Sequence, residues 1–192
     1  MVWLVAGLGN PGERYALTRH NAGRIVVDEM ARSAGDRFRK ARFLPAEVAE
    51  IRVGAERVVL VRSLRYMNES GPSYASVAKK QGIDPDRVIA VHDELDLPAG
   101  TLRVKFGGGG THNGLRSLNQ ALGTPEFNRV RMGVGRPPGR QDPTDFLLEP
   151  VGKHGAEELT SLADRAADVV RALIEEGLSG AQDRFNRSSP GE

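Results

Sequence analysis

The stretch VAGLGNPG, residues 5–12, decides how the fold of this chain begins. It follows the apolar run 2–5, a predicted first strand, and its glycines satisfy the G-x-G-x-x-G pattern of dinucleotide-binding folds. Such a fold continues into a parallel second strand that ends in an acidic residue about 20 positions further on. Asp28 and Glu29 lie near that distance but within a predicted helix, and the next β-rich segment, 46–62, predicts an antiparallel hairpin. The pattern is therefore weak support for a nicotinamide cofactor.

The rest of the chain alternates between helical periodicity and short β-rich runs. The predicted elements are, in chain order, a helix at 22–34, strands at 46–53 and 57–62, a helix from Ser70-Gly71-Pro72 to Gly82, strands at 87–92 and 102–106, a helix at 115–122, a strand at 129–134, a long helix at 155–176 and a short helix to Phe185. This order predicts an α/β fold, a single domain over residues 1–187 with a mixed twisted sheet flanked by helices. We expect a mobile surface loop at 136–145 and a disordered tail at 188–192.

Composition excludes several classes of protein. The 192 residues are 39% hydrophobic, enough for one core, and the longest apolar runs, such as 58–61, are far below the roughly 20 residues that cross a bilayer. No cysteine is present, so disulfides and thiolate metal sites are excluded and a reducing cytoplasm is the expected location. A formal charge of +2 permits a polyanionic partner without demanding one.

Water is the predicted nucleophile of any hydrolytic chemistry, because the chain has no cysteine, no G-x-S-x-G elbow and no H-E-x-x-H helix. Histidine, with an ordinary pKa of about 6.5, suits the general base that water needs. Of the 4 histidines, His154 is predicted at the surface and His92 packed within a strand, and His112 beside the glycine run is the weaker competitor. His20 lies in a polar loop after the first strand, where a solvated residue is also typical.

Several motifs in order carry a family resemblance. LGNPG at 8–12 is followed by TRHN at 18–21, YMNESG at 66–71, HDELDLP at 92–98 and HNGL at 112–115. These motifs resemble those of the bacterial-type peptidyl-tRNA hydrolases, and the resemblance extends from Leu4 to about Phe185.

The resemblance implies a site and a reaction. His20 would be the general base and Asp93 would hold it, fixing the tautomer that accepts a proton and stabilising the imidazolium. Asn10, Asn68 and Asn113 would contact the peptide and help to position the water, although each is also typical of a turn former. Three further residues are expected to line the substrate site, with core packing as the alternative for the last two: Tyr15, Tyr66 and Met67.

Basic residues are candidates for the tRNA end of such a substrate. Arg103 and Lys105 alternate along a predicted strand and share a face, and Arg131 lies on the next strand. The resemblance implies that Lys105 and Arg131 bind the 5′ phosphate, so that charge rather than base sequence is recognised. A solvated strand face is the alternative.

Two features count against a simple transfer of the family pattern. The acidic stretch 93–96 is a rival magnesium or calcium site, although it lacks further ligands at a recognisable spacing, and we expect no metal. Family members commonly carry GGGxGG before HNG, whereas 107–111 is one residue shorter and has Thr111 where glycine is expected. Because a β-branched residue tolerates positive φ poorly, we expect the loop path into Asn113 to differ from that of the family.

The sequence therefore predicts a monomeric, cytoplasmic, cofactor-independent esterase with peptidyl-tRNA as substrate and no obligate protein partner. It would cut the ester between the peptide and the terminal ribose, releasing free tRNA and peptide. The alternatives are an RNA-binding relative that no longer hydrolyses anything and a nucleotide-dependent oxidoreductase. Retention of both His20 and Asp93 counts against the first.

Overall fold

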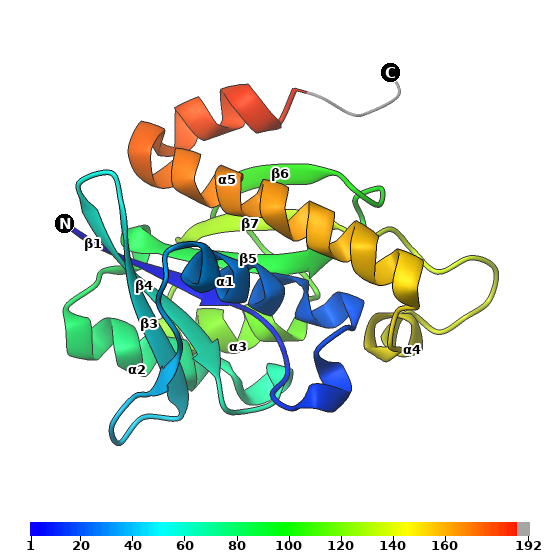
Figure 1. Cartoon of the computed structure of the whole chain (residues 1–192), viewed down its shortest axis with the longest axis horizontal. Coiled ribbons are helices and arrows are strands. Elements are labelled where there is room, and N and C mark those ends of the chain that lie inside the picture. Colours follow the sequence, from blue (N-terminus) through cyan, green and yellow to red (C-terminus); the bar gives the residue numbers. More distant parts are fainter. Residues whose placement is uncertain (188–192) are drawn as a thin grey trace.

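A computed structural model describes residues 1–187 of the chain as one α/β layer structure, as predicted (Figure 1). The tail expected at 188–192 lies outside the described residues. The strands are β1 Val2–Gly7, β2 Arg39–Lys40, β3 Ala46–Val53, β4 Glu56–Ser63, β5 Val88–Glu94, β6 Leu102–Phe106 and β7 Asn128–Gly133. The helices are α1 Ala22–Ser33, α2 Gly71–Gln81, α3 Asn113–Leu122, α4 Pro143–Leu148 and α5 Lys153–Phe185, with short 3₁₀ turns η1 Glu13–Tyr15, η2 Arg19–Asn21, η3 Met67–Glu69 and η4 Pro85–Arg87.

The described strands form one mixed sheet in the order β2-β3-β4-β1-β5-β7-β6. Strands β4, β1, β5 and β7 run parallel to one another, whereas β3 pairs antiparallel with β4 and β6 antiparallel with β7. The predicted hairpin over β3 and β4 is confirmed, with Val53 opposite Glu56 at its tight turn. This hairpin takes the place of the second parallel strand that a dinucleotide-binding fold requires.

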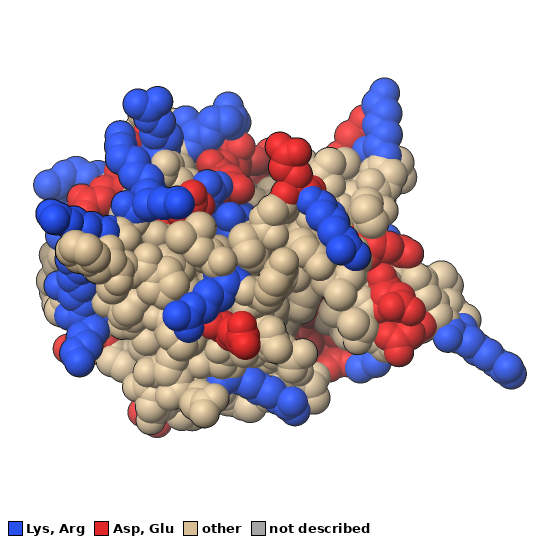
Figure 2. Space-filling model, turned by 90° about the horizontal axis from the view of Figure 1, so that it is seen from below, with Lys and Arg blue, Asp and Glu red and all other residues tan. Residues whose placement is uncertain are grey.

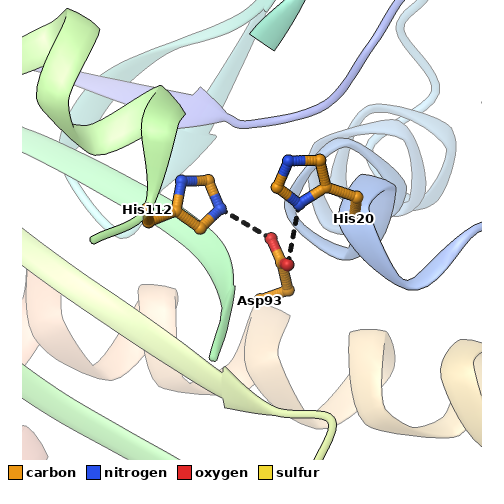
Figure 3. Close-up of side chains that lie close together, drawn as sticks. All are labelled: His20, Asp93 and His112. Carbon is orange, nitrogen blue, oxygen red and sulfur yellow. Dashed lines mark hydrogen bonds and ion pairs between the residues drawn. The ribbon is translucent and has the colours of Figure 1, made fainter. Parts of the chain in front are cut away.

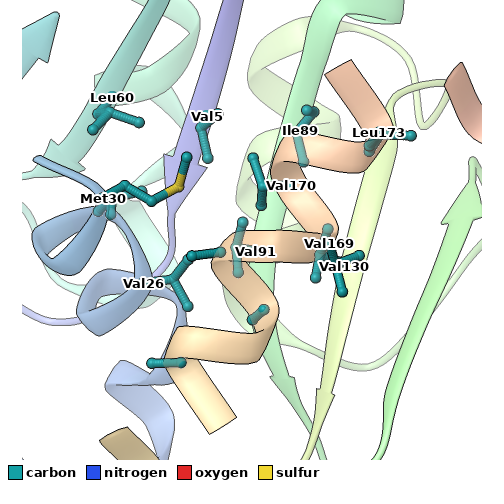
Figure 4. Packing of buried hydrophobic residues seen from close by; sticks show 14 of the residues in the cluster. Val5, Val26, Met30, Leu60, Ile89, Val91, Val130, Val169, Val170 and Leu173 are labelled. Atoms are coloured by element: carbon teal, nitrogen blue, oxygen red, sulfur yellow. The ribbon is translucent and has the colours of Figure 1, made fainter. Parts of the chain in front are cut away.

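Two hydrophobic layers enclose the sheet. Helices α1 and α5 cover one face, where Val26, Met30, Val170 and Leu173 pack on Ile89 and the residues around it (Figure 4). Helices α2 and α3 cover the other face, with Tyr74, Val77 and Leu118 among the buried contacts. No helix within residues 1–187 is both long and apolar enough to cross a membrane.

Some boundaries differ from those predicted. The segment expected to be a mobile loop ends in helix α4, because Asp142 caps it by accepting hydrogen bonds from the amides of Thr144 (2.8 Å) and Asp145 (3.3 Å). Pro143 follows the cap at the first helical position, where its missing N–H costs nothing. The D-P-T-D signal is therefore a helix start that the Pro- and Gly-rich composition concealed.

Helix α5 contains a break at Gly177, whose φ of 79° lies in the left-handed region. Beyond it the chain packs against β6, where the side chain of Asn186 accepts from the amide of Val104 (2.8 Å) and donates to its carbonyl oxygen (3.0 Å). The short final helix predicted to reach Phe185 corresponds to this last part of α5.

The glycines of the opening stretch allow close packing against α1. A Cβ atom on Gly7 would lie 2.7 Å from the carbonyl oxygen of Gly23, and one on Gly23 would lie 1.9 Å from the carbonyl oxygen of Val91. The turn after β1 therefore rests directly on the start of α1, and α1 rests on β5. The glycine pattern reflects backbone contact within the fold rather than a cradle for a dinucleotide.

We predict that Gly23→Ala lowers the free energy of unfolding by at least about 2 kcal/mol, because the added methyl group overlaps main-chain atoms of β5 that cannot move independently. Urea unfolding followed by circular dichroism measures the change. Gly152→Ala is the matched control, since its Cβ would meet nothing within 4 Å and its φ of −70° suits any residue. Equal stability of the two variants would contradict the packing argument.

Candidate active site

The candidate site lies at the carboxyl ends of β1 and β5, where ligands bind in open α/β sheets. A cleft of about 650 Å³ opens there between the turns that follow β1 and β4 and the start of α3, with α4 contributing a further wall. Asp93, the penultimate residue of β5, lies at its floor. The chain segments before α1 and at the start of α3 approach this residue from opposite faces of the sheet.

Asp93 is 2% exposed, yet both of its carboxylate oxygens have partners (Figure 3). Oδ2 lies 2.8 Å from Nδ1 of His20, and Oδ1 lies 2.7 Å from Nε2 of His112. Burial raises the pKa of Asp93, but the two adjacent imidazoles and their hydrogen bonds outweigh it, and the net pKa lies well below its usual range. The carboxylate is thus ionised, and both imidazole nitrogens act as donors.

His112 has a fixed tautomer. As the residue that caps α3, it accepts hydrogen bonds at Nδ1 from the amides of Gly114 (3.0 Å) and Leu115 (3.4 Å). Its proton must therefore sit on Nε2, facing Asp93. With both nitrogens engaged, His112 is not free to take a proton from water, which removes it as a rival base.

His20 is arranged differently. Its Nδ1 donates to Asp93, so the lone pair is on Nε2, which points away from the carboxylate (Figure 3). Burial lowers the pKa of His20, but the charge of Asp93 and the hydrogen bond to it raise the pKa above its ordinary value. This is the geometry of a general base held by a carboxylate.

The same three side chains resemble a metal site in composition, because their ligand atoms lie within 4.8 Å of one another. A cation on Nε2 of His112 would need the lone pair there, and the imidazole proton would have to move to Nδ1. That proton would then face the N–H groups of Gly114 and Leu115. The hydrogen bonds around His112 favour protons over a metal ion at this place.

The other two histidines lie where the sequence predicts them. His92 is 1% exposed within β5, and burial, followed by the nearby His112, lowers its pKa to about 3. Its Nδ1 lies 2.8 Å from the main-chain oxygen of Asp93. His154 is at the surface and pairs with Glu158 at 3.1 Å.

Asn10 lines the cleft, and the oxygen of its side-chain amide is already bonded. The amide of Met67 donates to its Oδ1 (2.7 Å), which leaves the Nδ2 group for a ligand. All the predicted peptide-contacting residues line the cleft, and their places are the turn after β1 (Asn10, Tyr15), the segment at η3 (Tyr66, Met67, Asn68) and the start of α3 (Asn113). Met67 is buried there, and the rings of Tyr15 and Tyr66 meet edge to face at 6.1 Å.

The shortened glycine loop still delivers Asn113 to the cleft. Gly107 and Gly108 take positive φ values of 69° and 102°, and Thr111 is not among the residues in the left-handed region. The strain expected at Thr111 is therefore avoided, because the glycines before it make the turn.

Basic residues also line the cleft, among them Lys105 and Arg131. Burial, followed by the charges of Arg131 and Arg129, lowers the pKa of Lys105, while Arg131 has a distant partner in Glu94 (3.6 Å). Arg129 is 1% exposed and donates to the carbonyl oxygens of Gly108 (2.8 Å) and Pro125 (3.2 Å). This buried guanidinium tethers the glycine loop through neutral acceptors, so that its charge adds to that of its neighbours.

Arg103 lies opposite Arg131 in the register of β6 and β7. Its Nη1 donates to the carbonyl oxygen of Leu102 (2.8 Å), and it is not among the described residues that line the cleft. Charge is also uneven elsewhere, since Lys and Arg crowd one end of the face in Figure 2, while uncharged residues fill most of its middle. A net charge of +2 thus conceals local basic surfaces.

Sequence reasoning names His112 only as the weaker candidate base, and it gives no role to the buried Arg129 or to Asn21, whose side chain bonds the main chain of Asn10. No sequence signal marks the role of His112 at the start of α3, because histidine is not a typical helix cap. The burial of Arg129 has no local signal, since no sequence pattern marks a buried arginine. Only the adjacency of Asn21 to His20 in TRHN offered a signal.

The fold and the cleft together define a class, an α/β protein whose cleft brings a histidine held by a buried carboxylate together with neutral amides and cations. The chain belongs to the peptidyl-tRNA hydrolase family, whose model matches residues 4–191. It is 49% identical to the peptidyl-tRNA hydrolase of Pseudarthrobacter chlorophenolicus, with 96% of this chain and 95% of that one covered. With that of Frankia alni, the identity is 50% and the coverage 96% and 93%. The crystal structure of peptidyl-tRNA hydrolase from Acinetobacter baumannii matches with a TM-score of 0.89 and 32% identity over 99% of this chain and 97% of that one.

We predict that the pKa of His20, measured by NMR titration, lies above 6.5, and that Asp93→Asn brings it below 6.5 because burial then acts alone. A raised pKa in the folded chain means that the pair stabilises the fold below about pH 6.5, and that this contribution is lost as the pH rises through the folded pKa. Urea unfolding at pH 5.5 and 8 measures the stability, and the contribution of His20 should favour pH 5.5 in the unaltered chain and pH 8 in Asp93→Asn. An unchanged pKa in that variant would contradict the assigned pairing.

Proposed function

We propose that this chain hydrolyses the ester between the peptide and the terminal ribose of peptidyl-tRNA, with His20 as the general base. The observation that carries the proposal is the 2.8 Å contact between Nδ1 of His20 and the buried Asp93, at a cleft that the family's substrate would enter. A water at Nε2 of His20 gives up a proton as its oxygen adds to the ester carbonyl carbon. The tetrahedral intermediate then collapses, the bond to the ribose oxygen breaks, and the imidazolium returns the proton to that oxygen.

Asp93 supports this cycle without changing its own protonation. It fixes the tautomer of His20 before the reaction and stabilises the imidazolium during it. Because His112 donates to the second oxygen, the carboxylate cannot rotate away when the charge on His20 changes. The base is thus held in one orientation throughout.

The amide of Asn10 explains a preference for acylated substrates. Its free Nδ2 group is a donor, which suits a peptide carbonyl oxygen. An aminoacyl ester with a free ammonium would place one donor against another and leave both unpaired. We place Asn68 and Asn113 beside it as further amide contacts, and Tyr15, Tyr66 and Met67 as the walls around the peptide.

We predict that the chain cleaves an N-acetylaminoacyl-tRNA much faster than the unacylated form, and that His20→Ala loses on the order of 10² to 10⁴-fold in kcat. Release of labelled aminoacid derivative measures both. His154→Ala is the matched control, because that side chain is 85% exposed and should leave the rate unchanged. Equal rates on the two esters would defeat the proposed selectivity, and full activity of His20→Ala would remove it as the base.

We propose that the cleft binds the 5′ phosphate of the tRNA through Lys105 and Arg131. Within residues 1–187 the hydrogen bonds of Arg129 go to neutral oxygens, and the carboxylate near both Lys105 and Arg131 is that of Glu94, 3.6 Å from Arg131. Three cations beside this carboxylate support an anionic ligand. Arg103 shares their sheet face and is proposed as a weaker contributor to phosphate binding. Recognition by charge and shape would let one enzyme accept many tRNAs.

We predict that Lys105→Ala raises KM with little change in kcat, and reduces the slope of log KM against log salt by about 1. Steady-state hydrolysis between low and moderate salt measures the slope. Lys80→Ala, at the far end of α2, serves as the matched control and should behave as the unaltered chain. If removal of the 5′ phosphate from the substrate left the effect of Lys105→Ala intact, the phosphate assignment would be wrong.

We further propose that the enzyme acts as a cytoplasmic monomer without a cofactor or obligate protein partner. The base, its carboxylate, the amide contacts and the cations line one cleft of this chain, so the proposed chemistry calls on no residue of a second copy.

A further inference from the structure

Asn21 lies next to the base but serves another part of the site. It is the last residue of η2, it precedes α1, and it is 1% exposed. Its Oδ1 accepts from the main-chain amide of Asn10 (2.9 Å), and its Nδ2 donates to the carbonyl oxygen of the same residue (2.9 Å). One side chain therefore satisfies both main-chain polar groups of a residue eleven positions away.

These paired bonds limit where the side chain of Asn10 can lie. With N–H and C=O of residue 10 both held, its peptide groups cannot rotate without breaking a buried hydrogen bond. From that fixed backbone, Oδ1 of Asn10 reaches the amide of Met67 at 2.7 Å. A series of hydrogen bonds therefore runs from Asn21 through Asn10 to Met67, and it sets the orientation of the Nδ2 group of Asn10.

The packing around Gly9 shows how closely the loop is set on Asn21. A Cβ atom at Gly9 would lie 3.0 Å from Cγ of Asn21 and 2.7 Å from Cβ of Arg24. No larger residue fits without displacing the side chain that bonds Asn10. The glycine and the asparagine thus act together to place the residue between Gly9 and Pro11.

We infer that Asn21 is a positioning residue that determines the preference for acylated substrates by acting through Asn10. This inference rests on the proposed function, because the selectivity belongs to the same cleft. A displaced Nδ2 donor would contact the peptide carbonyl poorly, and misplacement by about 1 Å can cost on the order of 10²-fold. The base is held independently by Asp93, so that cleavage continues while the preference weakens.

The test compares Asn21→Ala with the unaltered chain on N-acetylaminoacyl-tRNA and on unacylated aminoacyl-tRNA. We expect the ratio of the two kcat/KM values to fall on the order of ten-fold, mainly through a higher KM for the acylated ester. Asn128→Ala is the matched control, because it also removes a buried amide that bonds a main-chain oxygen, that of Asp86 (2.9 Å). It should lower stability and leave the ratio unchanged.

A double variant separates positioning from general loss of structure. If Asn21 acts through Asn10, Asn10→Ala and Asn10→Ala/Asn21→Ala should show the same ratio. Gly9→Ala keeps the side chain of Asn21 but crowds it, and we expect this variant also to lower the ratio. It replaces Asn21→Ala in the test if that variant does not fold.

Three outcomes would overturn the inference. The first is an unchanged ratio in Asn21→Ala or, if that variant does not fold, an unchanged ratio in Gly9→Ala. The second is a fall of the ratio in Asn128→Ala as large as that in Asn21→Ala. The third is a lower ratio in the double variant than in Asn10→Ala. In each of these cases the unaltered chain still discriminates, and the proposed function stands. An unaltered chain that cleaved neither ester, or both equally, would instead remove the proposed function and this inference together.

Discussion

A buried carboxylate held between two imidazoles is the interaction on which the site depends. Removing the charge of Asp93 from water is costly unless both oxygens find donors, and each donor comes from a different layer of the fold. His20 arrives from the segment before α1 and His112 from the start of α3. The requirement to pair one charge therefore ties the two faces of the sheet together at the cleft.

The hydrogen bonds at the start of α3 determine which nitrogen of His112 carries its proton. Because the first amides of α3 point at Nδ1 of His112, the proton of that ring is held on the side of Asp93. The amides at the start of α3 thus fix the proton of His112, the proton of His112 fixes one oxygen of Asp93, and the other oxygen fixes the proton of His20. Only the last ring in the series has a lone pair left for chemistry, which is why two similar histidines have different roles.

Much of this could be predicted from the sequence, and the limits have physical causes. Periodicity and turn residues located β3, β4, α1 and α2 to within a residue or two, because these elements are set by local patterns. The proximity of His20 and Asp93 came from family motifs, and the structure brings the two together, although their roles stay predictions. The bonds of Asn21 and the burial of Arg129 arise from chain segments far apart in sequence, for which no local pattern exists. Helix α4 was missed because proline and glycine dominated the composition just before its cap.

The break at Gly177 has a consequence for how copies of this chain meet. Strand β6 is one of the two edge strands of the sheet, and the free polar groups of an edge strand are a template onto which another chain can add. The reversal at Gly177 brings Asn186 against Val104, whose outward N–H and C=O it occupies. Because Gln182 donates to the same carbonyl oxygen (3.2 Å), the outward main-chain groups of Val104 are already bonded and cannot receive a strand of a second copy at that residue.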